Sequence, residues 1–328
     1  MAYHHKILNK FLILIVFILM SGQQIMAVPT FPTLSFESIQ QRHDQIKKDI
    51  QVRWTDLVTK KINFAPYGQK TDEEIYQEYD KLEKFRLHLW YQNPDISPRV
   101  CQKGYDVSQA LLEKGFYRVI NSISFAYNCT DDTYNASTIL INNQHFIAMQ
   151  EPSPEILPLF FKLLINHHAS ILVRLKPQFE YINEYSIKYW ENKLTPDESQ
   201  LKMEFLHSGN TFQPVSIPYF AIEMWRDNEA LDIPTFYNLV QRVRDTYKEL
   251  KNKGPIACHC SSGVGRTGTF LAALTLADII DQSGLKELSI EKVVLELSIQ
   301  RPNLMNTSKQ YLMLYRFVDY YVQKNNKG

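Results

Sequence analysis

The sequence predicts an α/β (α+β) protein in which helices flank a mixed, highly twisted central β-sheet, preceded by a helical N-terminal arm. Two observations support this fold class. From about residue 96, short runs rich in β-branched and aromatic residues alternate with stretches of helical periodicity, which is typical of a sheet covered by helices. From residue 267 onward the periodicity is helical, so helices should close the domain at its C-terminal end.

The first 27 residues have the layout of a secretory signal peptide. Lys6 and Lys10 precede an apolar run, Phe11–Met20, and the small residue Ala27 follows a polar stretch. The apolar run has about half of the roughly 20 residues that a membrane-spanning helix needs. We therefore expect residues 1–27 to be cleaved, leaving an exported, periplasmic or extracellular protein without a stable membrane anchor. The alternative is a protein tethered to the membrane by an uncleaved signal.

Residues 28–95 form the predicted helical arm. Apolar residues recur at helical spacing within residues 36–62, with charged residues between them. Thr71 and the acidic residues after it resemble a helix N-cap with an acidic first turn, leading into a helix over Ile75–Trp90. Two helices of this length can barely bury their own apolar faces, so we expect them to pack on the domain that follows. A separate docking module is the alternative.

Residues 96–325 read as one domain of catalytic size. Its predicted strands are Phe116–Ile120, Ser137–Ile141, His145–Met149, Ala169–Leu175, Lys202–Leu206, Val215–Met224 and Ile256–His259. Its predicted helices are 154–166, 235–252, 267–283, 290–299 and 308–323.

Composition excludes several classes of protein. The 328 residues are 45% apolar and 22% charged, which excludes a disordered tail or linker. Lys and Arg number 36 against 35 Asp and Glu, and no block of like charge occurs, so we expect no nucleic-acid partner. The four cysteines, Cys101, Cys129, Cys258 and Cys260, are too few for a disulfide scaffold and lack the spacing of a zinc site. We expect no metal and no cofactor.

The most informative segment joins the strand at 256–259 to the helix at 267. Backbone N–H groups of residues 261–266 can curl there into a positive ring that fits a tetrahedral oxyanion. Gly263 and Gly265 permit backbone angles and a close approach that a Cβ atom would obstruct. Such a ring favours the thiolate form of Cys260, and Arg266 can hold two phosphate oxygens at once. We expect Cys258, on the strand, to belong to the core.

The run HCSSGVGRTG at 259–268 resembles the HC-x5-R-[ST]-G signature loop of protein tyrosine phosphatases. The resemblance implies that Cys260 attacks phosphorus and that Arg266 holds the phosphate. His259 then has a supporting role, and Thr267 either donates toward the leaving sulfur or serves as a helix N-terminal hydroxyl. The phosphate would be bound by the loop residues Ser261, Ser262, Gly263, Val264 and Gly265.

Other segments resemble the same family, in its order, over about residues 95–325. Tyr134–Ser137 and Phe146–Pro152 resemble structural core segments. Lys114–Tyr117 resembles the start of the loop that walls the phosphotyrosine pocket, which makes Tyr117 the candidate to stack on the substrate ring. Nine residues before Tyr189-Trp190, Glu180 stands where the family keeps a carboxylate that orients the arginine, with Glu184 as the alternative.

The resemblance also implies a general acid, because a phenolate leaves slowly unless its oxygen is protonated. Asp227 keeps its place two residues after Trp225, although Arg226 replaces the family's proline. Asp232, placed relative to Pro234, is the alternative.

Four further positions either match the family pattern or depart from it. Asn306 and Gln310 resemble the pair that positions water for the second step, with Asn306 replacing a glutamine. Val119 replaces an aspartate that holds the substrate peptide, and Phe116 replaces an arginine. Peptide recognition could therefore differ from the family's even where catalysis does not.

The leading hypothesis is therefore a protein-tyrosine phosphatase acting through a phosphocysteine on phosphotyrosine proteins, including those of a host. Two alternatives stay open. One is a phosphatase of phosphoserine, phosphothreonine or phosphoinositides that uses the same loop, although the five residues between Cys260 and Arg266 carry no charge. The other is a catalytically silent module that binds phosphotyrosine.

Overall fold

The structure is a computed structural model, and we describe the parts of the chain whose placement it determines. These are residues 41, 44–49, 51–52, 64, 66–91, 129–131, 134–152, 157–177, 200–206, 212–251, 253–301 and 303–325. All of them belong to one compact unit, Leu34–Gly328. The predicted signal peptide and the predicted strand Phe116–Ile120 lie outside the described residues.

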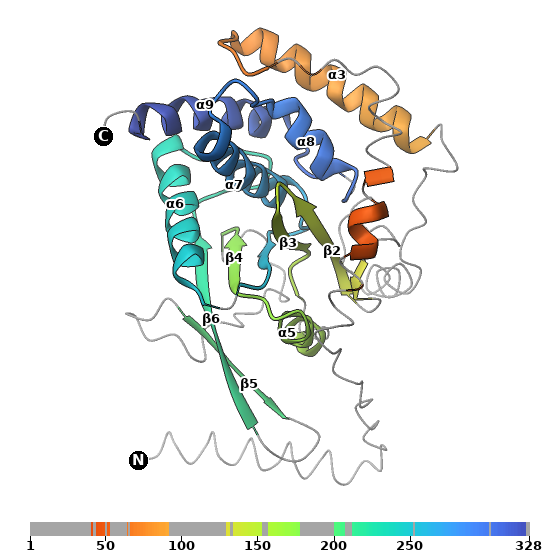
Figure 1. Ribbon diagram of the computed structural model, residues 1–328, viewed down its shortest axis with the longest axis vertical. Helices are drawn as coiled ribbons and strands as arrows, with labels where there is room; N and C mark the ends of the chain where they lie inside the picture. Colours follow the sequence, from red (N-terminus) through yellow and green to blue (C-terminus); the bar gives the residue numbers. More distant parts are fainter. Residues whose placement is uncertain are drawn as a thin grey trace, which may run out of the picture. The chain divides into compact units, whose positions relative to one another are not determined.

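A seven-stranded mixed sheet forms the centre of the described unit (Figure 1). Its strands lie in the order β1-β2-β3-β7-β4-β6-β5. β3, β7, β4 and β6 run parallel to one another, whereas β1, β2 and β5 pair with their neighbours in antiparallel fashion. The bounds are β1 (Cys129–Asp131), β2 (Tyr134–Ile141), β3 (Gln144–Met149), β4 (Ile171–Leu175), β5 (Gln200–Leu206), β6 (Phe212–Ile222) and β7 (Ile256–His259). The predicted mixed sheet is confirmed.

β7 lies at the middle of the sheet and is buried along its whole length. Cys258 pairs in register with Ala148 of β3 on one side and with Val173 of β4 on the other. Because parallel strands share one carboxyl edge, the segments that follow β3, β4, β6 and β7 meet there. The loop that begins at Cys260 therefore lies among the segments that follow β3, β4 and β6.

Helices cover both faces of the sheet. The bounds are α3 (Asp72–Tyr91), α5 (Leu157–Asn166), α6 (Ile233–Glu249), α7 (Gly265–Ser283), α8 (Ile290–Ser298) and α9 (Ser308–Asn325). α5 packs on one face through Phe160, Leu163 and Leu164, in a cluster that includes Ala257 of β7. Ile256, Cys258 and Cys260 belong to the larger core on the opposite face, as the alternation of side chains along a strand requires. Cys258 is a core residue, as predicted.

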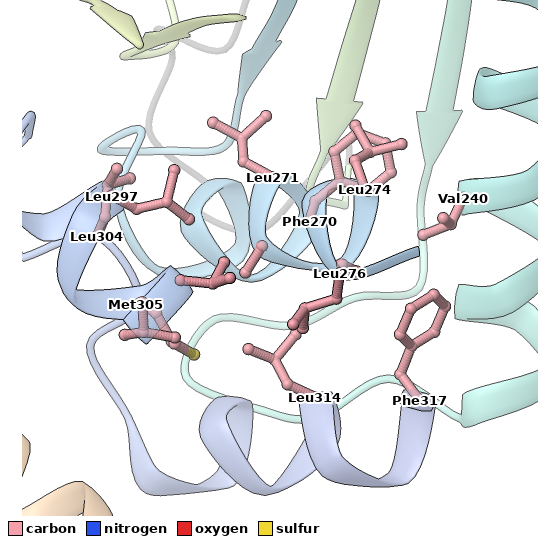
Figure 2. Close-up of a cluster of buried hydrophobic side chains, with 14 of the residues drawn as sticks. Val240, Phe270, Leu271, Leu274, Leu276, Leu297, Leu304, Met305, Leu314 and Phe317 are labelled. Carbon is pink, nitrogen blue, oxygen red and sulfur yellow. The ribbon is translucent and has the colours of Figure 1, made fainter. Parts of the chain in front are cut away.

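α7 is the central helix of that larger core. Each of its residues from Gly265 to Ala277 is buried, because the helix has neighbours on several sides. Figure 2 shows side chains of α7 meeting Leu314 and Phe317 of α9 and Val240 of α6. The start of α7, which continues directly from the Cys260 loop, is thus fixed by packing along the helix.

α3 packs against α8 and α9, so this part of the arm joins the domain as predicted (Figure 1). Its N-terminus has the predicted cap: the Glu74 amide donates to Thr71 Oγ1 at 3.3 Å, and the Thr71 amide donates to Glu74 Oε2 at 2.8 Å. This reciprocal pair satisfies two amides that the helix itself cannot bond. The face toward α8 and α9 buries Ile75, Tyr79, Leu82 and Arg86, which recur at intervals of three and four residues.

Observed boundaries differ from the predicted ones by a few residues. α6 begins at Ile233 instead of residue 235, because Asp232 caps it and a proline follows within the first turn. β6 spans Phe212–Ile222 instead of Val215–Met224, so Glu223 and Met224 belong to the loop. Among the described residues, no helix has both the length and the apolar character needed to cross a membrane.

Candidate active site

The loop after β7 takes its shape from a glycine. Gly263 has a φ angle of +72°, a left-handed conformation that side chains disfavour. A Cβ atom on Gly263 would lie 2.1 Å from the backbone oxygen of Met149 at the end of β3. Cys260 begins the loop and is only 2% exposed. The loop therefore turns tightly against β3 and carries a buried sulfur.

Three successive carbonyl groups of this loop are bonded to groups outside it. Ser261 O accepts from the Glu151 amide at 3.1 Å. Ser262 O and Gly263 O accept from the Arg301 guanidinium at 3.2 and 2.9 Å. In a trans peptide the N–H points opposite to the C=O, and the described residues contain no cis peptide. The N–H groups of residues 262–264 therefore point away from Glu151 and Arg301. On that side of the loop they can donate hydrogen bonds to an anion.

The N-terminus of α7 adds further amide donors to this place. Val264 is the N-cap residue, and no side chain among the described residues caps the helix. Its carbonyl accepts from the Gly268 amide at 2.7 Å and from the Met305 amide at 3.1 Å. The first amides of a helix have no partner within it and carry the positive end of its dipole. The loop and α7 together can thus bind a tetrahedral oxyanion.

Arg266 is fully buried, and its guanidinium joins the loop to the segment after β6. Nη1 donates to Trp225 O at 2.8 Å, and Nη2 donates to Ser261 Oγ at 3.1 Å. Nη2 also lies 3.1 Å from Asp227 Oδ1. Arg266 therefore brings Asp227, from the segment after β6, close to Ser261, the residue next to Cys260.

The segment 223–232 is anchored by Trp225 at one point and by Asp232 at another. Trp225 is fully buried, donates from Nε1 to Glu229 O at 2.8 Å, and packs edge-on against Phe236 at 5.4 Å between ring centroids. Asp232 accepts from the Thr235 amide at 3.0 Å as the N-cap of α6. Asp227 has a 39% exposed side chain beside Arg266. The two acidic candidates thus occupy different environments.

Asn306 and Gln310 lie against the start of α7. A Cβ atom at Gly265 would lie 2.5 Å from Asn306 Oδ1 and 3.1 Å from Gln310 Nε2. The Asn306 amide donates to Gln310 Oε1 at 3.3 Å. Gln310 is fully buried, and its Nε2 has no hydrogen-bond partner among the described residues. This arrangement leaves a buried donor next to the loop.

Most of the domain matches one known protein family. The family model described as protein-tyrosine phosphatase matches residues 116–320, which is more than half of the chain. The chain belongs to the protein-tyrosine phosphatase family. The matched region contains every described residue of the site.

Three relatives illustrate the family match. Tyrosine-protein phosphatase 69D of Drosophila melanogaster is 26% identical over 277 residues, which cover 75% of this chain and 18% of that protein. Receptor-type tyrosine-protein phosphatase eta of Mus musculus is 25% identical over 280 residues, covering 78% and 22%. Tyrosine-protein phosphatase 2 of Schizosaccharomyces pombe is 26% identical over 217 residues, covering 58% and 30%. The chain thus spans less than a third of the length of these relatives.

His259, just before the phosphatase-family signature cysteine, is held neutral by its surroundings. Its side chain is fully buried, and burial, followed by the charge of Arg174, lowers its pKa to about 3. Nδ1 lies 3.2 Å from Cys260 O, and the ring meets Phe160 of α5 edge-on at 5.9 Å between centroids. The imidazole therefore orients the peptide of Cys260 without carrying charge.

Thr267 and Cys258 are also buried near the loop of this phosphatase-family site. The Thr267 side chain is fully buried and interacts with the Cys258 thiol, and its two predicted roles stay predictions. Burial raises the pKa of the Cys258 thiol well above its ordinary value. Cys258 therefore remains a neutral core side chain.

Sequence reasoning missed the charged residues that hold this phosphatase-family loop from outside. Arg301 is fully buried and, besides the loop carbonyls, donates to Asn135 Oδ1 at 3.2 Å and Ser137 Oγ at 3.1 Å. Lys176, the first residue after β4, pairs with Glu151, whose amide donates to Ser261 O. No local pattern marks these residues, because their partners lie far away in the sequence. Arg301 comes after α8, next to Gln300 and Pro302 in a polar stretch, so its local sequence gives no signal of this role.

Three candidates from the sequence, Tyr117, Glu180 and Glu184, lie outside the described residues, as do Phe116 and Val119. Their roles stay predictions. Among the residues that the structure describes, no group of three or more His, Cys, Asp or Glu side chains could hold a metal ion.

Proposed function

We propose that this chain is a protein-tyrosine phosphatase that hydrolyses phosphotyrosine through a phosphocysteine intermediate. The observation that carries the proposal is the guanidinium of Arg266, which contacts Ser261, next to Cys260, and Asp227. A phosphate-binding group, a nucleophile and an acid are then within reach of one bound phosphate. Substrates are phosphotyrosine proteins, as the family membership implies.

In the first step Cys260 attacks phosphorus. The S–P bond forms while the bond from phosphorus to the tyrosyl oxygen breaks, and Asp227 gives its proton to that oxygen. Arg266 and the loop amides stabilise the charge that develops on the phosphoryl oxygens. Asp227 is favoured over Asp232 because the Asp232 carboxylate already accepts the Thr235 amide at the start of α6.

In the second step water releases the phosphate. Gln310, whose buried Nε2 has no partner among the described residues, and Asn306 hold the water. Asp227 accepts a proton from this water as its oxygen attacks phosphorus and the S–P bond breaks. Inorganic phosphate leaves, and Cys260 returns to the thiolate.

A substrate panel tests the proposed function. Phosphate release is measured with a phosphotyrosine peptide, a phosphoserine peptide and an inositol phosphate head group, for the wild type and for Cys260→Ser. We expect turnover of the phosphotyrosine peptide by the wild type alone. Faster release from either other substrate would favour the alternative phosphatase class. Binding of the phosphotyrosine peptide without any turnover would favour a silent binding module.

We also propose that the protein is exported after cleavage of residues 1–27, so that it acts on phosphotyrosine proteins outside the producing cell, including those of a host. The charge and apolar pattern of the first 27 residues supports this proposal. Sequencing the N-terminus of the mature chain tests it. A mature chain that starts at Val28 is expected, and one that retains Met1 would contradict cleavage.

A further inference from the structure

A buried arginine of α3 reaches the backbone just before the water-positioning pair. Arg86 is only 3% exposed, although α3 lies before residue 116, where the family match begins. Its Nη1 donates to Leu304 O at 2.8 Å and to Ser298 Oγ at 2.9 Å, and its Nη2 donates to Met305 O at 3.1 Å. One guanidinium thus holds two successive carbonyl groups.

Those carbonyls belong to a segment with an unfavourable backbone conformation. Met305 has a φ angle of +59°, and so does Asn303. This region is uncommon for a bulky side chain such as Met305 and persists only where surrounding contacts impose it. Met305 is held on one side by its amide, which donates to Val264 O at 3.1 Å, and by its buried side chain (Figure 2). Arg86 holds it on the other side.

The position of Met305 sets that of the next residue, Asn306. The Asn306 amide bonds Gln310 Oε1, and its side chain lies against Gly265 at the start of α7. A change in the Met305 backbone would therefore move Asn306 and Gln310 relative to the loop. Cys260 and Arg266 are held by other contacts, from β7, Arg301 and Trp225. The Arg86 contacts therefore act most directly on Asn306 and Gln310, and they reach the loop through the bond from the Met305 amide to Val264 O.

We propose that Arg86 is a positioning residue for the hydrolysis of the phosphocysteine, through the backbone of Leu304 and Met305. The inference rests on the proposed function, because it concerns the second step of that reaction. Loss of the guanidinium should leave attack by Cys260 intact and slow the attack of water. The planar guanidinium of an arginine suits this role, because its nitrogens reach both carbonyls and Ser298 at once. A lysine ammonium has one nitrogen and cannot hold all three groups.

The test compares Arg86→Met with Leu82→Ala. Leu82 lies on the same buried face of α3 and is 2% exposed, so Leu82→Ala loosens the packing of the helix while keeping the guanidinium that bonds Leu304 O and Met305 O. Rapid-mixing kinetics with p-nitrophenyl phosphate separate the burst of nitrophenol, which reports the first step, from the steady-state rate, which reports hydrolysis. Both variants are assayed well below their own melting temperatures.

For Arg86→Met we expect an unchanged burst rate and a steady-state rate lower by about tenfold, because small displacements of positioning groups are costly. Arg86→Lys should recover part of that loss. Leu82→Ala should change neither rate. Equal loss of both rates in Arg86→Met, or a pattern identical to that of Leu82→Ala, would show that Arg86 serves stability alone and would overturn the inference.

The two proposals fail in different ways. If the wild type releases no nitrophenol, the phosphocysteine mechanism is wrong and the role in hydrolysis is wrong with it. If the wild type turns over normally and Arg86→Met does too, only the role of Arg86 is wrong. Amide hydrogen exchange adds a readout that needs no turnover: residues 303–306 should exchange faster in Arg86→Met than in Leu82→Ala, and equal exchange would contradict the contact.

Discussion

At the scale of single residues, the geometry of the site depends on the absence of a Cβ atom at Gly263. Its left-handed φ angle matches that of Gly284, +72° against +70°, but the surroundings of the two residues differ. A Cβ atom at Gly263 would meet the Met149 backbone at 2.1 Å, whereas one at Gly284 would meet nothing within 4 Å. The two glycines therefore form a matched pair.

We predict that Gly263→Ala lowers kcat/KM by about 100-fold or more, because the loop must move from its place against β3. Gly284→Ala should cost about 1–3 kcal/mol of stability from backbone strain and leave kcat/KM unchanged. Steady-state kinetics and thermal unfolding of both variants test the pair. Similar activity in both would mean that the tight turn against Met149 is not needed for catalysis.

His259 gives a prediction about pH and stability. Its pKa is about 3 in the folded protein and about 6.5 in an unfolded chain. Between these values the unfolded chain binds a proton that the folded one does not, so the contribution of His259 is complete above pH 6.5 and is lost as pH falls. The loss amounts to about 1 kcal/mol between pH 7 and 5.5.

His259→Gln should remove this part of the pH dependence. Denaturant unfolding of the wild type and the variant at pH 7 and pH 5.5 measures it. The difference in unfolding free energy between the two pH values should be smaller in the variant by that amount. The same pH dependence in both proteins would contradict a buried neutral imidazole.

The residues that could be predicted from sequence are those whose signal is local. Cys260 and Arg266 are six positions apart on one loop, and their spacing alone indicates the chemistry. Arg301 and Arg86 could not be predicted, because their partners are 38 and 218 residues away along the chain. Their roles follow only once the fold brings distant segments together.

At the scale of elements, the segment 223–232 distinguishes the two acids that the sequence left open. Asp227 contacts Arg266, whereas Asp232 caps α6. Asp227→Ala should lower kcat for a phosphotyrosine peptide by about 10²–10⁴-fold through loss of proton transfer. Asp232→Ala should cost about 1 kcal/mol of stability through loss of the cap and should keep kcat. Kinetics with thermal unfolding tests both, and the reverse pattern would assign the acid to Asp232.

The elements themselves were predicted well where turn and cap residues mark their ends. The Thr71 cap of α3 was predicted and is present. The predicted start of α6 is two residues late, because Asp232 and Pro234 form the cap and the first turn of the helix and not the end of the preceding loop. The sequence does not distinguish a capping aspartate from a catalytic one, since both occur just before a helix.

At the scale of the whole molecule, the folding unit extends beyond the family match. The match begins at residue 116, yet α3 buries Ile75, Tyr79, Leu82 and Arg86 against the rest of the domain. Each buried apolar side chain contributes about 1.5–3 kcal/mol, a large share of a typical stability of about 5–15 kcal/mol. The boundary predicted at residue 96 stays a prediction, and these contacts argue for an earlier one.

We predict that a chain beginning at Leu34 unfolds cooperatively, whereas one beginning at residue 96 does not, because the latter exposes the faces of α8 and α9. Calorimetry or denaturant unfolding with two probes measures the difference. Equal cooperativity and equal midpoints in the two chains would mean that α3 is dispensable for the fold.

The chemical account of the site depends on a covalent bond between Cys260 and phosphorus. Rapid acid quenching during turnover of a phosphotyrosine peptide, followed by peptide mass spectrometry, measures that bond directly. The account predicts one phosphoryl group on the peptide that contains Cys260 in the wild type, and more of it in Gln310→Ala, where water attack is slower. Phosphate release with no phosphoryl group on Cys260 at any quench time would contradict it.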